Sequence, residues 1–566
     1  MDSDYDVIIV GAGVAGALTA YSLKKARPEL KVLMLEAGRV EPDRLRLVGN
    51  YANADRKSSV SPYAGGPGDR EAPYPDPDKL TDYYVQSSDK NSQLQSTYLR
   101  LVGGSTWHWL GNVPRFVPND FRMRSLYGVG VDWPISYDDL EGWYGKAEHE
   151  LGVSGDHAEW DGLHGARRGD PFPMSKIWLS YSDLVAARDI DGLEIDGLKL
   201  KVMSTPQARN SQPYQGRPPC AGNSICVPIC PIKAKYDATV HVELATRAGA
   251  ELLEKAVVVR LEVDQDRHVR RVVYRRWDDH QEVTVTGHVV ILAAHAIETP
   301  KLLLMSKSDL APRGVANESD QVGRNLMDHL QGTSQARANE PLFPFRGPPT
   351  TAGIDVFRDG QFRRERAAFR MSLGNDGWGR SGSPLSDVID AVKKEKRFGN
   401  DLVKQLQYRV THQFRISYST EMLPDPGNRV EVDVDNPPDA SGIRRPKITF
   451  KGAPEYNQMA FAKAWAVMHR IYDAMGIPKE NRLVTEDTPE NRKKYSGAGH
   501  IMGTCRMGDN PKTSVVDREC RAHDHPNLFI IGSSTFPTCG TANPTLTVAA
   551  LALRAADTIA RQFAGD

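Results

Sequence analysis

Three cysteines lie within one short stretch in the first half of the chain. Cys220, Cys226 and Cys230 have the spacing C-x5-C-x3-C, and Pro231 directly follows the last of them. Cysteine thiolates hold iron–sulfur clusters, and a cysteine followed by proline is typical of ferredoxin-type runs. Zinc prefers four ligands, and neither a histidine nor a fourth cysteine is close in the sequence. Three thiolates suit a 3Fe-4S cluster; a disulfide with one spare thiol, or three buried free cysteines, are the alternatives.

A glycine fingerprint near the N-terminus indicates a second kind of chemistry. Gly11, Gly13 and Gly16 follow an apolar run and precede an alanine-rich helical pattern, and Glu36 ends the next apolar run. The first glycine suits a tight turn, the second lets the backbone approach a pyrophosphate, and the third allows close helix packing. The helix N-terminus then stabilises phosphates, and Glu36 can accept hydrogen bonds from a ribose. The pattern predicts dinucleotide binding.

The elements around these residues predict an α/β fold with an inserted part. Strands over 6–10 and 31–35 with a helix to about residue 25 form a βαβ unit, which favours a parallel sheet. A strand over 288–293 and a helix from Glu298 repeat the α/β pattern. Other segments differ from it: a Pro- and Gly-rich loop over 51–82, a proline-rich middle over 134–231, and alternating, antiparallel-like runs over 393–421 and 430–451.

Composition excludes several classes of function. The 566 residues hold 72 basic and 72 acidic side chains, so no net field favours nucleic acid or an anionic membrane. Six cysteines are too few for a disulfide framework. The N-terminus shows no secretory signal, and the late apolar stretch at 546–560 is interrupted by Arg554 and Asp557, which predicts a buried helix instead of a membrane span.

Several fragments together resemble the glucose-methanol-choline (GMC) family of flavoprotein oxidoreductases. They are LVGGSTWHWLGNVPRF at 101–116, VILAAHAIETPKLLLMS at 290–306, VGRNLMDH at 322–329, GHIMGTCRMG at 499–508 and PNLFIIGSSTFPTCGTANPTLTVAALAL at 526–553. The resemblance implies FAD, oxidation of a hydroxyl to a carbonyl, and a Rossmann-like FAD-binding domain with an inserted α+β substrate domain on a mainly antiparallel sheet. We expect residues 1–133, 232–335 and 495–566 to form the FAD-binding domain. Residues 134–231 and 336–494 are then the substrate and iron–sulfur-bearing region.

The same resemblance assigns the catalytic and flavin-binding residues. His500 and Asn543 match the family's active-site pair, with His500 as the base for the hydroxyl proton and Asn543 as a hydrogen-bond partner of the substrate oxygen. Asn543 before Pro544 is also a good helix cap, and the two roles can coexist. His108 matches the position that carries a covalent flavin in some members; packing between two tryptophans is the alternative. The further predicted FAD contacts are Gly103, Gly104, Val257 and Thr545.

Around the cysteines the resemblance narrows to one branch of the family. The run NSQPYQGRPPCAGNSICVPICPIKAKYD resembles the catalytic subunits of bacterial membrane-associated sugar dehydrogenases, although it departs from them at Ala221, Ser224 and Ile225. In that group three cysteines hold a 3Fe-4S cluster, and the subunit works with a small partner subunit and a cytochrome acceptor. The substrate is then a sugar, glycoside or polyol. We expect a periplasmic or membrane-associated location through the partner, with a cytoplasmic enzyme, a sugar oxidase that reduces dioxygen, and a non-enzymatic subunit as alternatives.

Overall fold

The apolar run that opens the chain forms the middle of a mostly parallel sheet. The computed structural model describes residues 3–53, 84–224, 226–227, 229–376, 384–439 and 442–564. Strand β1 (Tyr5–Val10) pairs in parallel with its neighbours on both sides, and its last four residues are buried. In spatial order the sheet contains β10 (Ala256–Val263), β11 (Val269–Arg276), β12 (Glu282–Leu292), β1, β2 (Val32–Leu35) and β9 (Glu251–Leu253), with β21 (Leu528–Ile530) beside β12.

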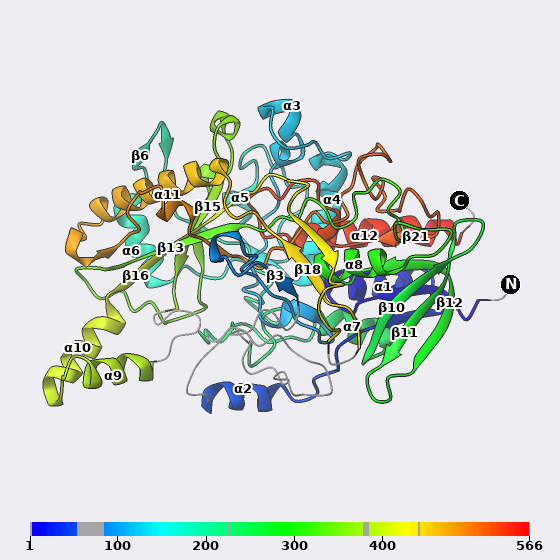
Figure 1. Cartoon of the computed structure of the whole chain (residues 1–566). Helices are drawn as coiled ribbons and strands as arrows, with labels where there is room; N and C mark the ends of the chain where they lie inside the picture. Colours follow the sequence, from blue (N-terminus) through cyan, green and yellow to red (C-terminus); the bar gives the residue numbers. More distant parts are fainter. Residues whose placement is uncertain are drawn as a thin grey trace.

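Helices from both ends of the chain pack beside this sheet. Helix α1 (Val14–Ala26) contacts α7 (Thr239–Arg247) and α12 (Thr545–Gln562), and α12 also contacts α4 (Tyr137–Leu151). Most of α12 is buried, which confirms the prediction of a buried helix there. Helix α8 (His295–Met305) begins three residues earlier than predicted, because its first turn buries Ala296 and Ile297 in the core. Both chain termini lie at this end of the molecule (Figure 1).

A second, antiparallel sheet forms the other end of the molecule (Figure 1). Its order is β19 (Arg482–Leu483), β13 (Leu330–Arg337), β16 (Gln413–Thr420), β15 (Phe369–Gly374), β14 (Ala352–Ile354) and β8 (Met203–Ser204), with β20 (Ser496–Gly497) on β13. Strand β16 alternates strictly, so Phe414, Ile416 and Tyr418 are buried on one face. Helix α11 (Glu455–Ala474) contacts β13 and β16, and Phe461 packs against the Tyr418 ring. The opposite face of the sheet is therefore left to polar side chains.

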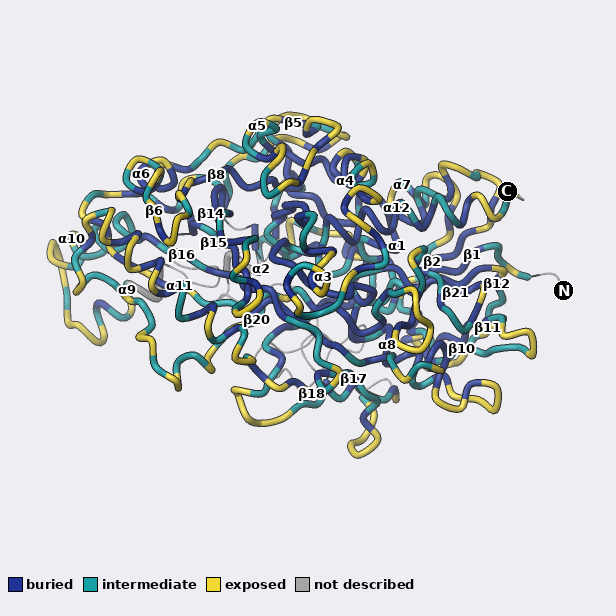
Figure 2. Tube along the Cα trace, turned by 90° about the horizontal axis from the view of Figure 1, so that it is seen from above, coloured by how far each residue is buried: buried dark blue, intermediate teal, exposed yellow. Residues whose placement is uncertain are grey.

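The predicted antiparallel run over 393–421 is wrong for its first part. Residues 399–411 form helix α10, which pairs with α9 (Pro384–Lys393), and only Gln413–Thr420 form a strand. Leu402 and Leu406 are spaced by one helical turn, and Arg397 pairs with Asp401 across the same spacing. The helix pair stands at one end of the molecule, where α10 has no buried residue (Figures 1 and 2).

Shorter elements complete the described part of the chain. The run over 430–451 does form antiparallel strands, β17 (Arg429–Val432) and β18 (Pro446–Thr449), and β3 (Val85–Gln86) lies parallel to β18. The predicted loop over 51–82 lies outside the described residues except for its first three, which end α2 (Arg44–Asn53). None of the described helices combines the length and the apolar character that a membrane span needs. The remaining elements are α3 (Met123–Tyr127), α5 (His157–Trp160), α6 (Tyr181–Ile190), β4 (Ser154–Gly155), β5 (Met174–Ser175), β6 (Glu194–Ile195) and β7 (Leu198–Lys199).

Candidate active site

A cavity of about 800 Å³ connects the two sheets. At one end it is lined by the glycine fingerprint between β1 and α1, and at the other by the polar face of the antiparallel sheet. Most of the predicted site residues share its lining: Gly11, Gly13, Glu36, Gly104, His108, Val257, His500, Asn543 and Thr545. The others, Gly16, Gly103 and the three cysteines, do not line it, although Val227 beside Cys226 does.

The fingerprint loop has the shape that a dinucleotide requires. A Cβ on Gly16 would lie 1.9 Å from the Gly11 carbonyl oxygen, so only glycine lets α1 pack this closely on β1. A Cβ on Gly13 would meet no atom within 4 Å, so bare backbone faces open space inside the cavity. This cradle fits the pyrophosphate of a dinucleotide at the N-terminus of α1.

Glu36 joins the two turns that border this cradle. Its carboxylate oxygens accept hydrogen bonds of 2.8 Å from the backbone N–H groups of Ala12 and Gly38. Burial raises the pKa of Glu36, and the two backbone donors oppose that effect. Because each carboxylate oxygen has a second lone pair, the side chain can still accept a hydrogen bond from a hydroxyl in the cavity.

His500 and Asn543 meet at the other part of the cavity. The Asn543 Nδ2 atom is 3.1 Å from His500 Nε2, and both residues line the cavity. The prediction that Asn543 caps the following helix is wrong, since α12 begins at Thr545 and no side chain caps it. The amide is directed to His500 instead. The spacing of the two residues in the sequence, 43 positions, spans the turn and strand that bring them together.

A second histidine, His329, determines which nitrogen of His500 carries a proton. His329 Nε2 faces two backbone carbonyl oxygens, Gly540 at 2.9 Å and Cys539 at 3.2 Å, so this nitrogen is the donor. Burial lowers the pKa of His329, which keeps the ring neutral and leaves Nδ1 as an acceptor. The His500 Nδ1 atom, 2.7 Å away, then donates to it. His500 Nε2 is left with a lone pair, as a proton acceptor requires.

Asp328, the neighbour of His329, holds the backbone of the loop that carries His500. One of its carboxylate oxygens accepts a 2.8 Å hydrogen bond from the His500 N–H, and the other accepts the Ser96 hydroxyl. Ser96 in turn accepts the Gly499 N–H at 2.9 Å. Burial raises the pKa of Asp328 to about 6. Asp328 and His329 thus fix the backbone and the ring of His500 respectively.

Sequence reasoning missed His329 as a functional residue. It ends the VGRNLMDH fragment, so the signal was present in a matched motif. Its partner is 171 residues away, and no local pattern places the two rings together. The histidine sits just before β13, whose pairing with β20 brings the 496–500 segment alongside.

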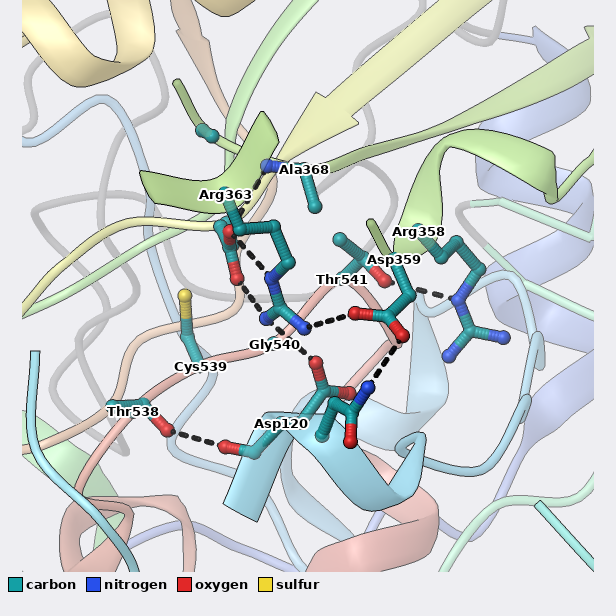
Figure 3. Close-up of polar contacts among 12 residues, drawn as sticks. Asp120, Arg358, Asp359, Arg363, Ala368, Thr538, Cys539, Gly540 and Thr541 are labelled. Atoms are coloured by element: carbon teal, nitrogen blue, oxygen red, sulfur yellow. Dashed lines mark hydrogen bonds and ion pairs between the residues drawn. The ribbon is translucent and has the colours of Figure 1, made fainter. Parts of the chain in front are cut away.

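The loop that carries Asn543 is fixed by buried charges (Figure 3). The Arg358 Nε atom donates to Thr541 Oγ1 at 2.9 Å, and Thr538 Oγ1 donates to the Asp120 carbonyl at 3.1 Å. Arg363 bridges the carboxylates of Asp120 and Asp359 next to the loop, as Figure 3 shows. Because these paired side chains are buried, each must keep its position relative to its partner. The pairs therefore hold the segment before Asn543 in one position.

His108 lines the cavity from the segment Trp107–His108–Trp109. Burial, with the nearby Lys235 ammonium, lowers the pKa of His108 to about 4, so the imidazole is neutral. Lys235 organises this segment: its Nζ donates to the carbonyls of Trp107 at 2.9 Å, Trp109 at 2.6 Å and Cys226 at 2.9 Å. The buried Lys235 ammonium therefore connects the cavity wall at His108 to the loop that carries Cys220, Cys226 and Cys230, called the cysteine loop below.

Two buried cations surround the cysteine loop. The Arg209 Nη1 atom lies 2.9 Å from Cys226 Sγ and 3.9 Å from Cys220 Sγ. Burial raises the pKa of Cys226, and the Arg209 charge opposes that rise. All six cysteines are described and none forms a disulfide, so the disulfide alternative is not the arrangement seen. Thiols beside Arg209 and Lys235 suit an anionic cluster chemically, but the described residues bring no three metal-binding side chains into one group.

The antiparallel sheet supplies a polar wall that the sequence did not reveal. Five of its outward-facing side chains line the cavity: Gln331, Arg370, Ser372, Ser417 and Ser419. Arg370 is buried and donates to Asp355 at 2.9 Å, Thr205 at 2.7 Å and Ser372 at 3.0 Å. These residues come from separate strands, so only the strand pairing shows that they form one surface.

Comparison with known proteins gives the family. Family models described as GMC oxidoreductase match residues 202–331 and 424–552. The large subunit of fructose dehydrogenase from Gluconobacter japonicus is 37% identical over 98% of this chain and 97% of its own length. A 2-methyl-1,2-propanediol dehydrogenase from Mycolicibacterium austroafricanum is 27% identical over 99% and 95%. The crystal structure of a pyridoxine 4-oxidase from Mesorbium loti shares the fold, with a TM-score of 0.65 at 19% identity and complete coverage of both chains.

These matches span the fingerprint, both sheets and the His500 loop, which agrees with the α/β fold and inserted antiparallel sheet predicted from the sequence. The chain belongs to the GMC oxidoreductase family and is an FAD-dependent enzyme that oxidises CH–OH groups.

Proposed function

We propose that this protein is a dehydrogenase that oxidises one hydroxyl of a neutral sugar or polyol to a carbonyl. The observation that carries this proposal is the hydrogen-bond chain that leaves His500 Nε2 as a proton acceptor beside Asn543, in a cavity roofed by hydroxyl- and amide-bearing side chains. The relative with 37% identity is named for fructose, which is consistent with this substrate class.

In this proposal His500 removes the hydroxyl proton of the substrate. His500 Nε2 accepts the proton while Asn543 Nδ2 donates a hydrogen bond to the substrate oxygen. The ring of His329 holds the productive tautomer, and Asp328 holds the His500 backbone. FAD, when bound, supplies the acceptor for the hydride that leaves the carbinol carbon. Helix α12 begins at the cavity, and its N-terminal partial charge favours negative charge there.

We assign the FAD-binding role to the cavity residues around the fingerprint. Gly11 and Gly13 present backbone to the pyrophosphate, Glu36 accepts a ribose hydroxyl, and the cavity lining adds Gly104, Val257 and Thr545. The neutral imidazole of His108 is the candidate for a covalent bond to the cofactor. Acid precipitation tests that bond: flavin that stays with the protein supports it, and complete release rejects it. His108→Ala is the control.

The polar wall favours neutral substrates over sugar acids. Arg370 is the charged side chain of this wall, and its guanidinium pairs with Asp355, so it offers hydrogen-bond donors without an uncompensated charge. The ion pairs around Arg370 contain one more carboxylate than arginines. Their members are Arg358, Arg363, Arg370, Asp120, Asp355, Asp359 and Glu421. An anionic substrate would gain no net attraction here.

Arg370→Met tests this assignment. The variant removes the donors that face the cavity, so we expect kcat/KM for neutral sugars to fall by about 10-fold or more, as loss of a charged hydrogen bond costs about 1.5–3 kcal/mol. A wild-type enzyme that prefers gluconate to the corresponding neutral sugar would contradict the assignment of neutral substrates.

We assign the cysteine loop to electron transfer. An iron–sulfur cluster, 3Fe-4S in this proposal, passes electrons singly, and Cys220, Cys226 and Cys230 would hold it beside the charges of Arg209 and Lys235. A small partner subunit and a cytochrome are then the acceptors, with a periplasmic or membrane-associated location through that partner. Iron and acid-labile sulfide analysis with low-temperature EPR on anaerobically purified protein tests the cluster. Fewer than about one iron per chain after reconstitution would reject a three-thiolate cluster.

The second candidate is an oxidase that reduces dioxygen, since the pyridoxine 4-oxidase shares the fold. Stoichiometric peroxide under air would favour it, and slow reaction with air but fast reaction with artificial acceptors would favour the dehydrogenase. The proposed function itself is tested by anaerobic mixing of the flavin-loaded enzyme with a panel of neutral sugars and polyols. At least one should bleach the flavin absorbance, and a panel that leaves it unchanged would overturn the proposal.

A further inference from the structure

A second cavity of about 320 Å³ lies on the same polar face of the antiparallel sheet. Its lining includes Gln335 and Arg337 of β13, Gln413 and Arg415 of β16, Asp376 after β15, and Asn481. These are side chains with amide, guanidinium and carboxylate groups. The mechanism proposed above uses none of them.

The strand register makes the two cavities neighbours. On β16, Ser417 lines the first cavity and Arg415, two residues away on the same face, lines the second. On β15, Ser372 lines the first cavity and Gly374 lines the second. Ser372 is paired with Ser417 across the strands, and Gly374 with Arg415. Successive residues on one face of a strand are about 7 Å apart, so one cross-strand row ends the first cavity and the next row begins the second.

Hydrogen bonds cross the boundary between these rows. The Arg415 Nη1 atom donates to Ser417 Oγ at 3.2 Å, and the Thr333 hydroxyl lies 3.2 Å from the same oxygen. The polar surface is therefore continuous from the row that contains Arg370 to the row that contains Arg415.

The second cavity repeats the arrangement that Arg370 makes in the first. Arg370 lies across Gly353 of the adjacent strand, where a Cβ would be 2.4 Å from its Nη2 atom, and it binds Asp355, two residues after that glycine. It also donates to the serine two positions after itself, Ser372, at 3.0 Å. The arginine is thus held flat against the sheet by a glycine, a carboxylate and a serine.

Arg415 has the same three kinds of partner. The sequence spacings from the glycine to the carboxylate and from the arginine to the serine are also the same. It lies across Gly374, where a Cβ would be 2.6 Å from its Nε atom. Its Nε and Nη2 atoms bind the Asp376 carboxylate at 3.1 and 2.7 Å, again two residues after the glycine, and it donates to Ser417 two positions after itself. Both guanidinium groups have their charge compensated while retaining N–H groups for a ligand.

The charge of the second cavity is also balanced. The lining holds three arginines, Arg337, Arg409 and Arg415, and two carboxylates, Asp376 and Glu480. Arg415 pairs with Asp376, and Arg409 pairs with Glu395 outside the lining. Such a surface suits a neutral ligand that donates and accepts many hydrogen bonds. Leu483, 72% exposed on the rim, adds an apolar contact for the carbon face of a sugar ring.

We propose that the second cavity is a distal sugar subsite, which binds the part of a glycoside or oligosaccharide that extends beyond the ring being oxidised. This inference rests on the proposed function, and it specifies the substrate as one longer than a single sugar ring. Because adjacent rows are only about 7 Å apart, one ligand of more than one ring can extend from the first cavity into the second.

Arg415→Gln is the test, with kinetics on paired substrates. The pair is a monosaccharide that the enzyme oxidises and the disaccharides that carry the same ring at one end. For the wild type, at least one disaccharide should have a kcat/KM equal to or above that of the monosaccharide. The variant should raise the KM of that disaccharide about 10-fold, because charge-assisted hydrogen bonds are lost, and change the monosaccharide kcat/KM less than twofold.

Three matched variants keep the test independent of folding. Gln413→Ala removes one amide at the same cavity and should act in the same direction with a smaller effect. Gly374→Ala keeps the charge of Arg415 but displaces its guanidinium, and should resemble Arg415→Gln. Arg188→Gln breaks a similar two-point ion pair with Asp189 on the surface and should leave both substrates unchanged.

The outcomes separate this inference from the proposed function. Equal losses on both substrates, or no disaccharide that is oxidised or competes with the monosaccharide, would overturn the distal subsite while leaving monosaccharide oxidation intact. If no monosaccharide is oxidised, the proposed function fails. Calorimetric binding of the disaccharides to the flavin-loaded enzyme then still decides the subsite: about 10-fold weaker binding by Arg415→Gln supports it, and unchanged or absent binding rejects it.

Discussion

The surroundings of His500 and of Cys226 differ in the charge of the groups that contact each side chain. His500 is held by a neutral imidazole, an amide and a backbone contact to Asp328, and its Nε2 atom remains a proton acceptor. Cys226 lies against Arg209 and accepts the Lys235 ammonium at its carbonyl, so two buried cations stabilise negative charge there. The first environment suits proton transfer and the second suits the storage of electrons. Under the proposed function, the proton and the electrons of one oxidation are handled in two places.

The largest expected effect is at the histidine. In His500→Ala the proton acceptor is lost, and we expect kcat/KM for the active sugar to fall by roughly 10² to 10⁴, the usual worth of base catalysis. Steady-state assays with an artificial acceptor measure it. His469→Ala, an exposed histidine on α11, is the control and should be unaffected. A loss of less than 10-fold would show that His500 is not the base.

The next effect is at the cysteine loop. Cys226→Ser should lower the iron content and slow electron transfer to a one-electron acceptor by more than about 100-fold, since even outer partners of metal ligands are worth 10- to 100-fold. Bleaching of the flavin by sugar should stay within a factor of two. Cys520→Ala removes a buried cysteine outside the loop and should change neither property. Unchanged iron content in Cys226→Ser would show that Cys226 does not hold a cluster, and would contradict an electron-transfer role for the cysteine loop.

A smaller effect separates positioning by His329 from simple packing. His329→Leu removes the acceptor that fixes the His500 tautomer, and kcat should fall toward the lower limit of base catalysis, about 10²-fold. His329→Gln can still donate to the Gly540 carbonyl and accept from His500, so it should recover most of the activity. The pH profile should shift in His329→Leu and return in His329→Gln. Equal activity of the two variants would mean that His329 only fills space.

The smallest effect extends the comparison to acid stability. Burial lowers the pKa of His108 and of His295 to about 4, whereas histidine in an unfolded chain titrates near 6.5. The unfolded chain therefore binds more protons between these values, so the stabilisation is complete above about pH 6.5 and is lost as the pH falls toward 4. The thermal midpoint should drop by a few degrees over this range, and His295→Gln should drop less. A midpoint that rises on acidification would contradict the neutral histidines.

The dinucleotide end of the protein could be predicted from the sequence because its signals are local. The fingerprint, Glu36 and the apolar runs of β1 and β2 lie within forty residues, and each pattern is read directly from spacing. The buried helix α12 was predicted in the same way. The prediction failed for 399–411: Leu402 and Leu406 do follow helical spacing, but no residue of α10 is buried, so the helix has no core-facing side that would mark it in the sequence.

The end of the cavity around His500 depended on contacts that sequence spacing does not encode. His329 reaches His500 across 171 residues, and Arg370 reaches Asp355 and Thr205 through strand pairing. The Asn543 cap was predicted from a local preference, but the hydrogen bond to His500 takes its place. The domain boundaries, the covalent flavin and the iron–sulfur cluster remain predictions.

The most direct test of the separation between proton and electron sites is to measure the two half-reactions in both variants. Anaerobic rapid mixing with the active sugar follows bleaching of the flavin, and a second mixing with a one-electron acceptor follows its recovery. We predict that His500→Ala slows only the first half-reaction and Cys226→Ser only the second. If both variants slow the same half-reaction, the two sites are not separate and the account is contradicted.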